Sequence, residues 1–142
     1  MRVLDEKTAV YWIWFSQLRE TSIQQKWDLL QTFGDIDSIF NAQAVQLRAV
    51  KWMTKPVLDE LQNRDISQSY QIYKACKAGN IGLLPCTEGA YPAPLKEIPD
   101  PPVLLYYKGS LPDFSAQPIV AVVGTRHATA YGMRMADRKS VV

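Results

Sequence analysis

The sequence predicts a chain of the α+β or α/β class, in which a small helical bundle over residues 1–64 precedes the beginning of an α/β domain over residues 65–142. Two observations support this division. Up to about residue 64, apolar residues recur at intervals of three and four, which is the period of amphipathic helices. After residue 65, apolar residues gather in short runs between prolines and glycines, which is typical of strands. With 47% apolar residues, the chain can form a packed core.

The first half divides into several predicted helices. Two are indicated by the spacing of Val10, Ile13, Trp14 and Leu18, and of Ile23, Trp27, Leu30 and Phe33. Gly34 suits a helix C-terminus, and Asp35 and Asp37 can cap the apolar segment 36–40. Two further helices follow, one through Ala44, Leu47 and Val50, and one with Pro56 in its first turn and a buried face of Val57, Leu58 and Leu61.

The second half predicts one helix and three strands before a last helix. Asp65 and Gln68 stand in capping-box spacing, and their helix should end at Gly79 and lead into a strand over residues 81–84. Five prolines between residues 92 and 102 forbid long regular structure until a strand over residues 103–107. The apolar run 119–123 predicts a parallel strand covered on both faces. These elements are too few for a doubly wound sheet, so we expect the chain to be cut short.

The charge and the cysteine content exclude several classes of site. The net charge is +2, so a nucleic-acid site would have to be local rather than a broad basic surface. Cys76 and Cys86 form no CxxC pair and His127 is the single histidine, so the sequence supports neither a zinc site nor a disulfide framework. We expect no metal and two reduced thiols.

The N-terminus carries no predicted signal peptide. Asp5 and Glu6 precede the apolar run 9–15, and no small-residue cleavage pattern follows it. The run is also far shorter than the roughly 20 residues needed to cross a bilayer. We therefore expect a soluble, cytoplasmic protein with no membrane partner.

The turn after the run 119–123 is the candidate binding site. A strand that ends in Gly124 and leads into a helix offers backbone amides and a helix N-terminus to an anion. Arg126 adds a charged fork that can hold phosphate oxygens, and Thr125 adds a hydroxyl. Thr129 is the predicted N-cap of a helix over residues 130–138, and Gly132 in its first turn permits close approach.

The turn alone does not choose between a binding site and a simple change of chain direction. The spacing of Gly124 and Gly132 does not fit the G-x-G-x-x-G pattern of dinucleotide folds, and the Gly-Lys-Ser/Thr triplet of a Walker A loop is absent. Gly124 as a tight turn and Arg126 as a solvated charge are an equally good interpretation of this motif. Tyr106 and Tyr107 could stack on bases, but core packing is the better interpretation of that pair.

Two longer stretches resemble a known family. "GNIGLLPCTEGAYPAPLKEIPDPPVLLYYKG" and, after it, "IVAVVGTRHATAYGMRMAD" are similar to the bacterial DNA-processing protein A family, also called DprA or Smf. The matching elements fall in the family's order and spacing: Tyr91-Pro92, Leu95, Ile98, Asp100-Pro101-Pro102, Leu105, Lys108-Gly109, Val123-Gly124-Thr125-Arg126, Thr129, Tyr131-Gly132 and Met135-Ala136. "LLQTFGDIDSIF" in the helical half resembles the family more loosely.

The resemblance implies a sterile-alpha-motif-like helical domain followed by the start of an extended Rossmann domain. It also implies a protein without catalytic activity, cofactor or metal, which binds single-stranded DNA. Such proteins protect incoming strands in natural transformation and competence, and they load the RecA recombinase as recombination mediators. Gly124, Thr125 and Arg126 would then lie in the DNA site, with Thr129 and Gly132 beside them, and the full-length protein would be a homodimer.

Two departures from the family pattern keep alternatives open. The region "LRETSIQQKW" lacks the glycine-bearing hairpin of many family members, and the chain ends where the family's Rossmann domain continues, so we expect a fragment. One alternative is a Rossmann-type nucleotide hydrolase similar to the lysine-decarboxylase-like phosphoribohydrolases, whose "PGGxGT" signature is missing here. Another is an interaction module that acts through the helical half alone.

Overall fold

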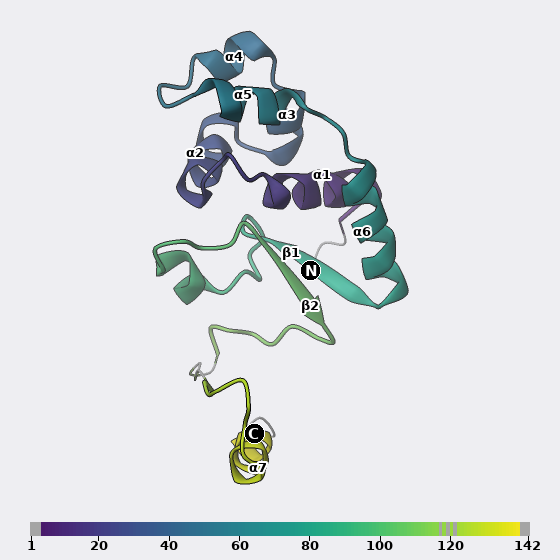
Figure 1. Ribbon diagram of the computed structural model, residues 1–142, viewed down its shortest axis with the longest axis vertical. Helices are drawn as coiled ribbons and strands as arrows, with labels where there is room; N and C mark the ends of the chain where they lie inside the picture. The colour runs from purple at the N-terminus through teal and green to yellow at the C-terminus, as the bar shows by residue number, and fades with distance from the viewer. Residues whose placement is uncertain (1–3, 117, 119, 121, 140–142) are drawn as a thin grey trace.

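The computed structural model describes residues 4–116, 118, 120 and 122–139. Its regular elements are, in chain order, α1 (Glu6–Gln17), α2 (Ile23–Phe33), α3 (Ile36–Asn41), α4 (Ala44–Arg48), α5 (Lys55–Gln62), α6 (Ser67–Ala78), β1 (Ile81–Pro85), the 3₁₀ helix η1 (Ala93–Glu97), β2 (Leu104–Lys108) and α7 (Ala130–Lys139). Helices α1 to α5 lie together at one end, and α7 lies apart at the other (Figure 1). The chain is therefore α+β, as the sequence predicts.

Helix α1 forms the centre of the core. It runs between α2–α5 on one side and the two strands on the other, and it packs against α3, α6 and β2 (Figure 1). Ile13 and Phe15 are fully buried on it, and the ring of Trp14 meets that of Phe40 edge to face with centroids 4.9 Å apart. Burial of an aromatic pair in this geometry adds about 0.5–1.5 kcal/mol beyond its area. The predicted buried residues of the first helix are thus confirmed.

Local capping explains where the helices of the first half begin and end. Asp35 accepts a hydrogen bond from the Ser38 amide at 2.7 Å and caps α3 as predicted, and Gly34 ends α2 with a φ of +88°. The sequence also predicts Asp37 as a cap for this segment, but its carboxylate instead forms an ion pair with Lys7 at 2.6 Å.

The α1–α2 loop is held by a carboxylate from a distant helix. Glu60, on α5, accepts hydrogen bonds from the backbone amides of residues 19, 20 and 21 and from the Thr21 hydroxyl at 2.9 Å. Thr21 is buried, and so is Lys26, whose ammonium donates to the carbonyls of Ser16 and Leu18. Burial lowers the pKa of Lys26, and the nearby Glu60 carboxylate partly offsets that shift. We call the Glu60 contacts with residues 19–21 the carboxylate clasp.

Strands β1 and β2 form an antiparallel pair. The register places Ile81 opposite Lys108 and Gly82 opposite Tyr107. Both strands lie where the sequence predicts them, and in the described residues the sheet consists of this pair. The start of α6 differs from the predicted capping box. Its N-cap is Ile66, which makes no side-chain cap hydrogen bond, and Asp65 accepts hydrogen bonds from the amide and hydroxyl of Ser67.

The proline-rich connection between the strands is tied to the helical half. Trp27 on α2 donates its indole N–H to the Pro101 carbonyl at 2.8 Å, and Gln24 donates to the Pro99 carbonyl at 3.0 Å. Five residues of the second half also join the same hydrophobic core cluster as the helices: Leu84, Cys86, Tyr91, Val103 and Leu104. The domain boundary that the sequence analysis places after residue 64 stays a prediction.

The strand predicted over residues 119–123 is not found at its described positions. Ile119 and Ala121 lie outside the described residues, and Val120, Val122 and Val123 belong to no strand and are 65–89% exposed. A buried parallel strand needs hydrogen-bonding neighbours and covers on both faces. In the part of the chain that the structure describes, β1 and β2 pair with each other, and no element covers these valines.

Both cysteines are free thiols, and burial sets their chemistry. Cys86 is 1% exposed, and its burial raises the pKa of the thiol to about 11. Because the folded state then holds this proton more tightly than the unfolded chain, Cys86 contributes stability that is complete below pH 9.0 and is lost as the pH rises through about 11.

We expect the free energy of unfolding to begin falling above pH 9.0, more steeply in the wild type than in Cys86→Ala. Urea unfolding followed by tryptophan fluorescence across this range measures the difference in slope. Cys76→Ala is the matched control. Burial also raises the pKa of the Cys76 thiol, but Cys76 is less buried than Cys86, so its removal should change the slope less. A Cys86→Ala protein with the wild-type pH dependence would contradict this expectation.

Candidate nucleic-acid interface

The predicted phosphate turn lies on the surface, immediately before α7. Gly124, Thr125, Arg126, Thr129 and Gly132 are all exposed. The helix N-terminus is present where the sequence predicts it, since α7 begins at Ala130. The context differs from the prediction, because the described residues just before the turn form no strand and so place it at no sheet edge.

Thr129 is the N-cap of α7. Its hydroxyl oxygen accepts a hydrogen bond from the Gly132 amide at 3.0 Å, and its carbonyl accepts from the Met133 amide at 2.9 Å. A Cβ on Gly132 would lie 3.2 Å from that hydroxyl, so the absent side chain leaves room for the cap. The amides of Ala130 and Tyr131 come first in the helix, where no intrahelical carbonyl can reach them, and they are its donors for an external anion.

The other side chains of the turn differ in what they can offer. Thr125 donates its hydroxyl proton to the His127 carbonyl at 2.9 Å, so this proton is engaged within the turn. An added Cβ on Gly124 meets no atom within 4 Å, and its φ is not in the left-handed region, so this conformation does not require glycine there. The exposed guanidinium of Arg126 is the strongest phosphate-binding group of the set.

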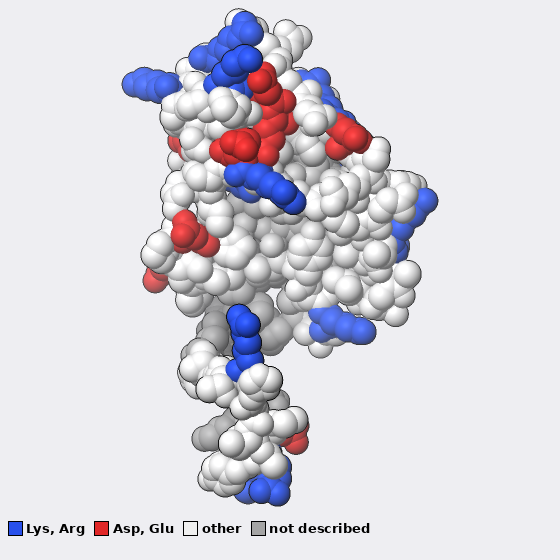
Figure 2. Space-filling view, in the orientation of Figure 1, with Lys and Arg blue, Asp and Glu red and all other residues white. Residues whose placement is uncertain are grey.

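The charges around the turn favour an anion. Residues 122–138 contain Arg126, Arg134 and Arg138 but one carboxylate, Asp137. Figure 2 shows blue side chains and one red group over α7 and the stretch leading to it, whereas blue and red side chains lie together over the helical half. The excess of positive charge is therefore local, which is what the low net charge of the whole chain requires of any nucleic-acid site.

The turn contains one internal contact that the sequence analysis did not predict. The Thr125 hydroxyl bond to the carbonyl two residues later is a local pattern that a threonine at this position could have indicated. In the part of the chain that the structure describes, His, Cys, Asp and Glu side chains form no group of three that could hold a metal. No helix over these residues has the length and apolar character needed to cross a membrane.

Comparisons with known proteins point to one family. Residues 82–141 match the family described as DNA recombination-mediator protein A. The chain is 29% identical over 128 residues to Protein Smf of Synechocystis sp. (strain ATCC 27184 / PCC 6803 / Kazusa), covering 87% of this chain and 32% of that protein. It is 32% identical over 98 residues to DNA processing protein DprA of Bacillus subtilis (strain 168), covering 60% of this chain and 33% of that protein.

The chain thus spans about a third of the length of the curated relatives it matches. No solved structure gives a significant match. The family match includes both strands, the proline-rich connection, the turn at Gly124 and all of α7 that the structure describes. Over residues 82–141, the chain is similar to the DprA/Smf family.

Proposed function

We propose that the chain binds single-stranded DNA by its backbone phosphates, at the turn formed by residues 124–129 and the first turn of α7. The observation that carries this proposal is the exposed Arg126, four residues before the start of α7, a helix whose first two amides have no intrahelical acceptor. It is supported by the family match, which includes this turn and carries the description of a DNA recombination mediator.

The wider role follows from the same resemblance. A protein that holds a strand mainly by its phosphates leaves most of its bases free, which suits a mediator that protects incoming strands in natural transformation and passes them to the RecA recombinase. We propose this role in the cytoplasm for the protein that carries the chain, as a binding protein without cofactor. The sterile-alpha-motif-like and extended Rossmann assignments are part of the same proposal.

Arg126→Ala should weaken binding to single strands by roughly 5- to 10-fold, because it removes one charge-assisted phosphate contact. The loss should be similar for all sequences, since phosphate contacts carry no base information. The slope of log affinity against log salt should also flatten by about 0.7 for each phosphate that the protein no longer neutralises. Fluorescence anisotropy with labelled oligonucleotides across a salt series measures both effects.

Arg48→Ala is the matched control, because Arg48 is an exposed arginine in the last turn of α4, at the end of the molecule opposite α7 (Figure 1). It should leave affinity and salt slope unchanged. An Arg126→Ala protein that matches the wild type in both would remove Arg126 from the site.

A further inference from the structure

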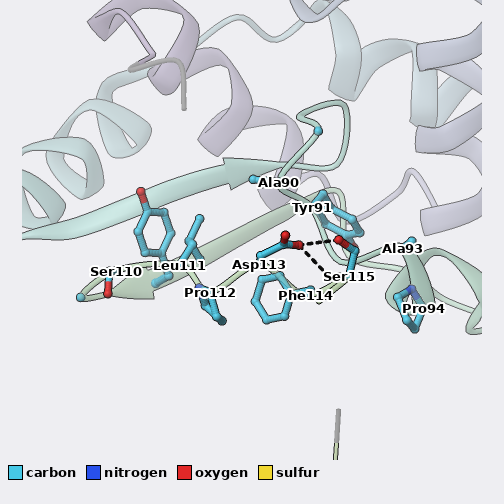
Figure 3. Close-up of a pocket in the computed structure, with 13 residues that line it drawn as sticks. Ala90, Tyr91, Ala93, Pro94, Ser110, Leu111, Pro112, Asp113, Phe114 and Ser115 are labelled. Atoms are coloured by element: carbon cyan, nitrogen blue, oxygen red, sulfur yellow. Dashed lines mark hydrogen bonds between the residues drawn. The ribbon is translucent and has the colours of Figure 1, made fainter. Parts of the chain in front are cut away.

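A cavity of about 750 Å³ opens between the loop after β1 and the segment that follows β2 (Figure 3). Its volume falls within the roughly 300–1,000 Å³ typical of small-ligand sites. Its larger apolar side chains are three aromatic rings, two prolines and a leucine: Tyr91, Tyr107, Phe114, Pro94, Pro112 and Leu111. None of its lining residues belongs to the turn 124–129 or to α7, so it is a separate feature of the surface.

The aromatic rings of the cavity differ in exposure. Tyr91 is a fixed wall, because it is 4% exposed and its hydroxyl donates to the Pro102 carbonyl at 2.7 Å. Tyr107 and Phe114 are half-buried, so part of each ring remains open to a ligand. Partly open aromatic faces are the groups on which unpaired nucleic-acid bases stack.

One carboxylate lies among these rings. Asp113 is drawn between Tyr91 and Phe114 in Figure 3, and it accepts hydrogen bonds from the amide of Ser115 at 2.9 Å and from its hydroxyl at 2.5 Å. These bonds lower the pKa of Asp113, so it is ionised at neutral pH. Both end on Oδ1, and a carboxylate has about four lone-pair sites on its two oxygens, so it can also accept a hydrogen bond from a ligand.

We propose that this cavity receives one base of the bound strand, and that Asp113 makes it favour a base with an exocyclic amino group, such as cytosine, over thymine. A carboxylate accepts a hydrogen bond from the N4 amino group of cytosine, whereas thymine presents the O4 acceptor at that position. This inference rests on the proposed function, since it names the part of the strand that the cavity would take.

A positive charge beside the Tyr91 ring suits a nucleotide better than a cationic ligand. The Lys96 ammonium lies over this ring, 5.6 Å from its centroid. It would repel an organic cation. A nucleotide instead brings a phosphate that the ammonium attracts, while its base meets the rings and the Asp113 oxygen.

The test compares three labelled strands of equal length at neutral pH: oligo-dC, oligo-dT and an abasic deoxyribose-phosphate strand. Wild type should bind oligo-dC about 2- to 12-fold more tightly than oligo-dT, the range expected for one net hydrogen bond. Both should bind more tightly than the abasic strand. Asp113→Asn should abolish or reverse the preference for dC, because its amide can donate to thymine O4.

Phe114→Ala should bring the affinities for oligo-dC and oligo-dT toward that of the abasic strand, by about 5- to 150-fold if the ring stacks on one base. Asp59→Asn, an exposed carboxylate on α5, is the control and should leave the dC-to-dT ratio unchanged. If Phe114→Ala does not fold, the ratio in the wild type and in Asp113→Asn still decides the question.

The outcomes separate this inference from the proposed function. Binding that is equal for dC, dT and abasic strands but weakened by Arg126→Ala would overturn the base site and leave the phosphate site in place. A dC preference that Asp113→Asn does not change would also overturn it. Failure of all three strands to bind would overturn the phosphate proposal. The base site would then be tested by titrating the protein with dCMP and with dTMP and following the NMR signals of the Phe114 ring. Equal shifts for the two nucleotides, or no shifts, would overturn it.

Discussion

Glu60→Ala should lower the free energy of unfolding by about 2–3 kcal/mol, the cost of leaving buried hydrogen-bonding groups without a partner. One carboxylate holds the whole α1–α2 loop, through three backbone amides and the hydroxyl of Thr21. Arg19 and Glu20 are exposed, so water can accept the hydrogen bonds that their amides donate to Glu60. Thr21 is 2% exposed, so its amide and hydroxyl are left without an acceptor. The buried Lys26 also loses the negative charge that offsets its desolvation.

Urea unfolding of wild type, Glu60→Ala, Glu60→Gln and Asp59→Ala measures this effect. Asp59 is the neighbouring carboxylate on α5, and its contact is an exposed pair with Lys55 at 3.8 Å, so its removal should cost less than about 1 kcal/mol. Glu60→Gln keeps one acceptor oxygen, so its free energy of unfolding should lie between those of the two alanine variants. Equal stability of Glu60→Ala and Asp59→Ala would show that the carboxylate clasp contributes nothing beyond a surface charge.

The helices could be predicted from the sequence because their signals are local. The period of three and four places the core faces of α1 and α5, Gly34 marks the end of α2, and Thr129 marks the start of α7. Each of these signals lies within one turn of the feature it predicts. Strands β1 and β2 follow in the same way from short apolar runs between turn residues.

Long-range partners could not be predicted. The carboxylate clasp joins positions about forty residues apart, and nothing near Glu60 in the sequence marks it as different from Asp59. The direction of strand pairing is also a tertiary property, since the apolar run of β2 fits a parallel or an antiparallel neighbour. For the run 119–123, an apolar pattern indicated a buried strand, but burial depends on what covers it.

The candidate site was predictable in its polar groups and not in its surroundings. The positions of Arg126 and of the Thr129 cap follow from the motif and from helix-start signals. The cavity depends on how segments 89–94 and 107–115 fold against each other, which the pairing of β1 with β2 decides. The sequence interpretation of Tyr107 as a core residue is half right, because the ring packs on the sheet and also lines the cavity.

Gly82→Ala should lower the free energy of unfolding by about 1–3 kcal/mol, the usual cost of overpacking. Gly82 faces Tyr107 across the strand pair, and a Cβ at residue 82 would lie 2.1 Å from Cζ of that ring. No real Cβ contact is that short, so the ring must leave its place on β1. Because Tyr107 also lines the cavity, displacement of its ring should weaken the binding of any ligand in the cavity.

A double-mutant cycle tests whether the ring is the cause. In a Tyr107→Ala background, Gly82→Ala should cost less than in the wild type, because the clashing ring is gone and alanine is preferred to glycine within a strand. Gly89→Ala is the matched control, since a Cβ there meets no atom within 4 Å and the φ of Gly89 is not in the left-handed region, so it should be close to neutral. If Gly82→Ala lowers the free energy of unfolding equally with and without the Tyr107 ring, its effect comes from the backbone and not from a clash with the tyrosine ring.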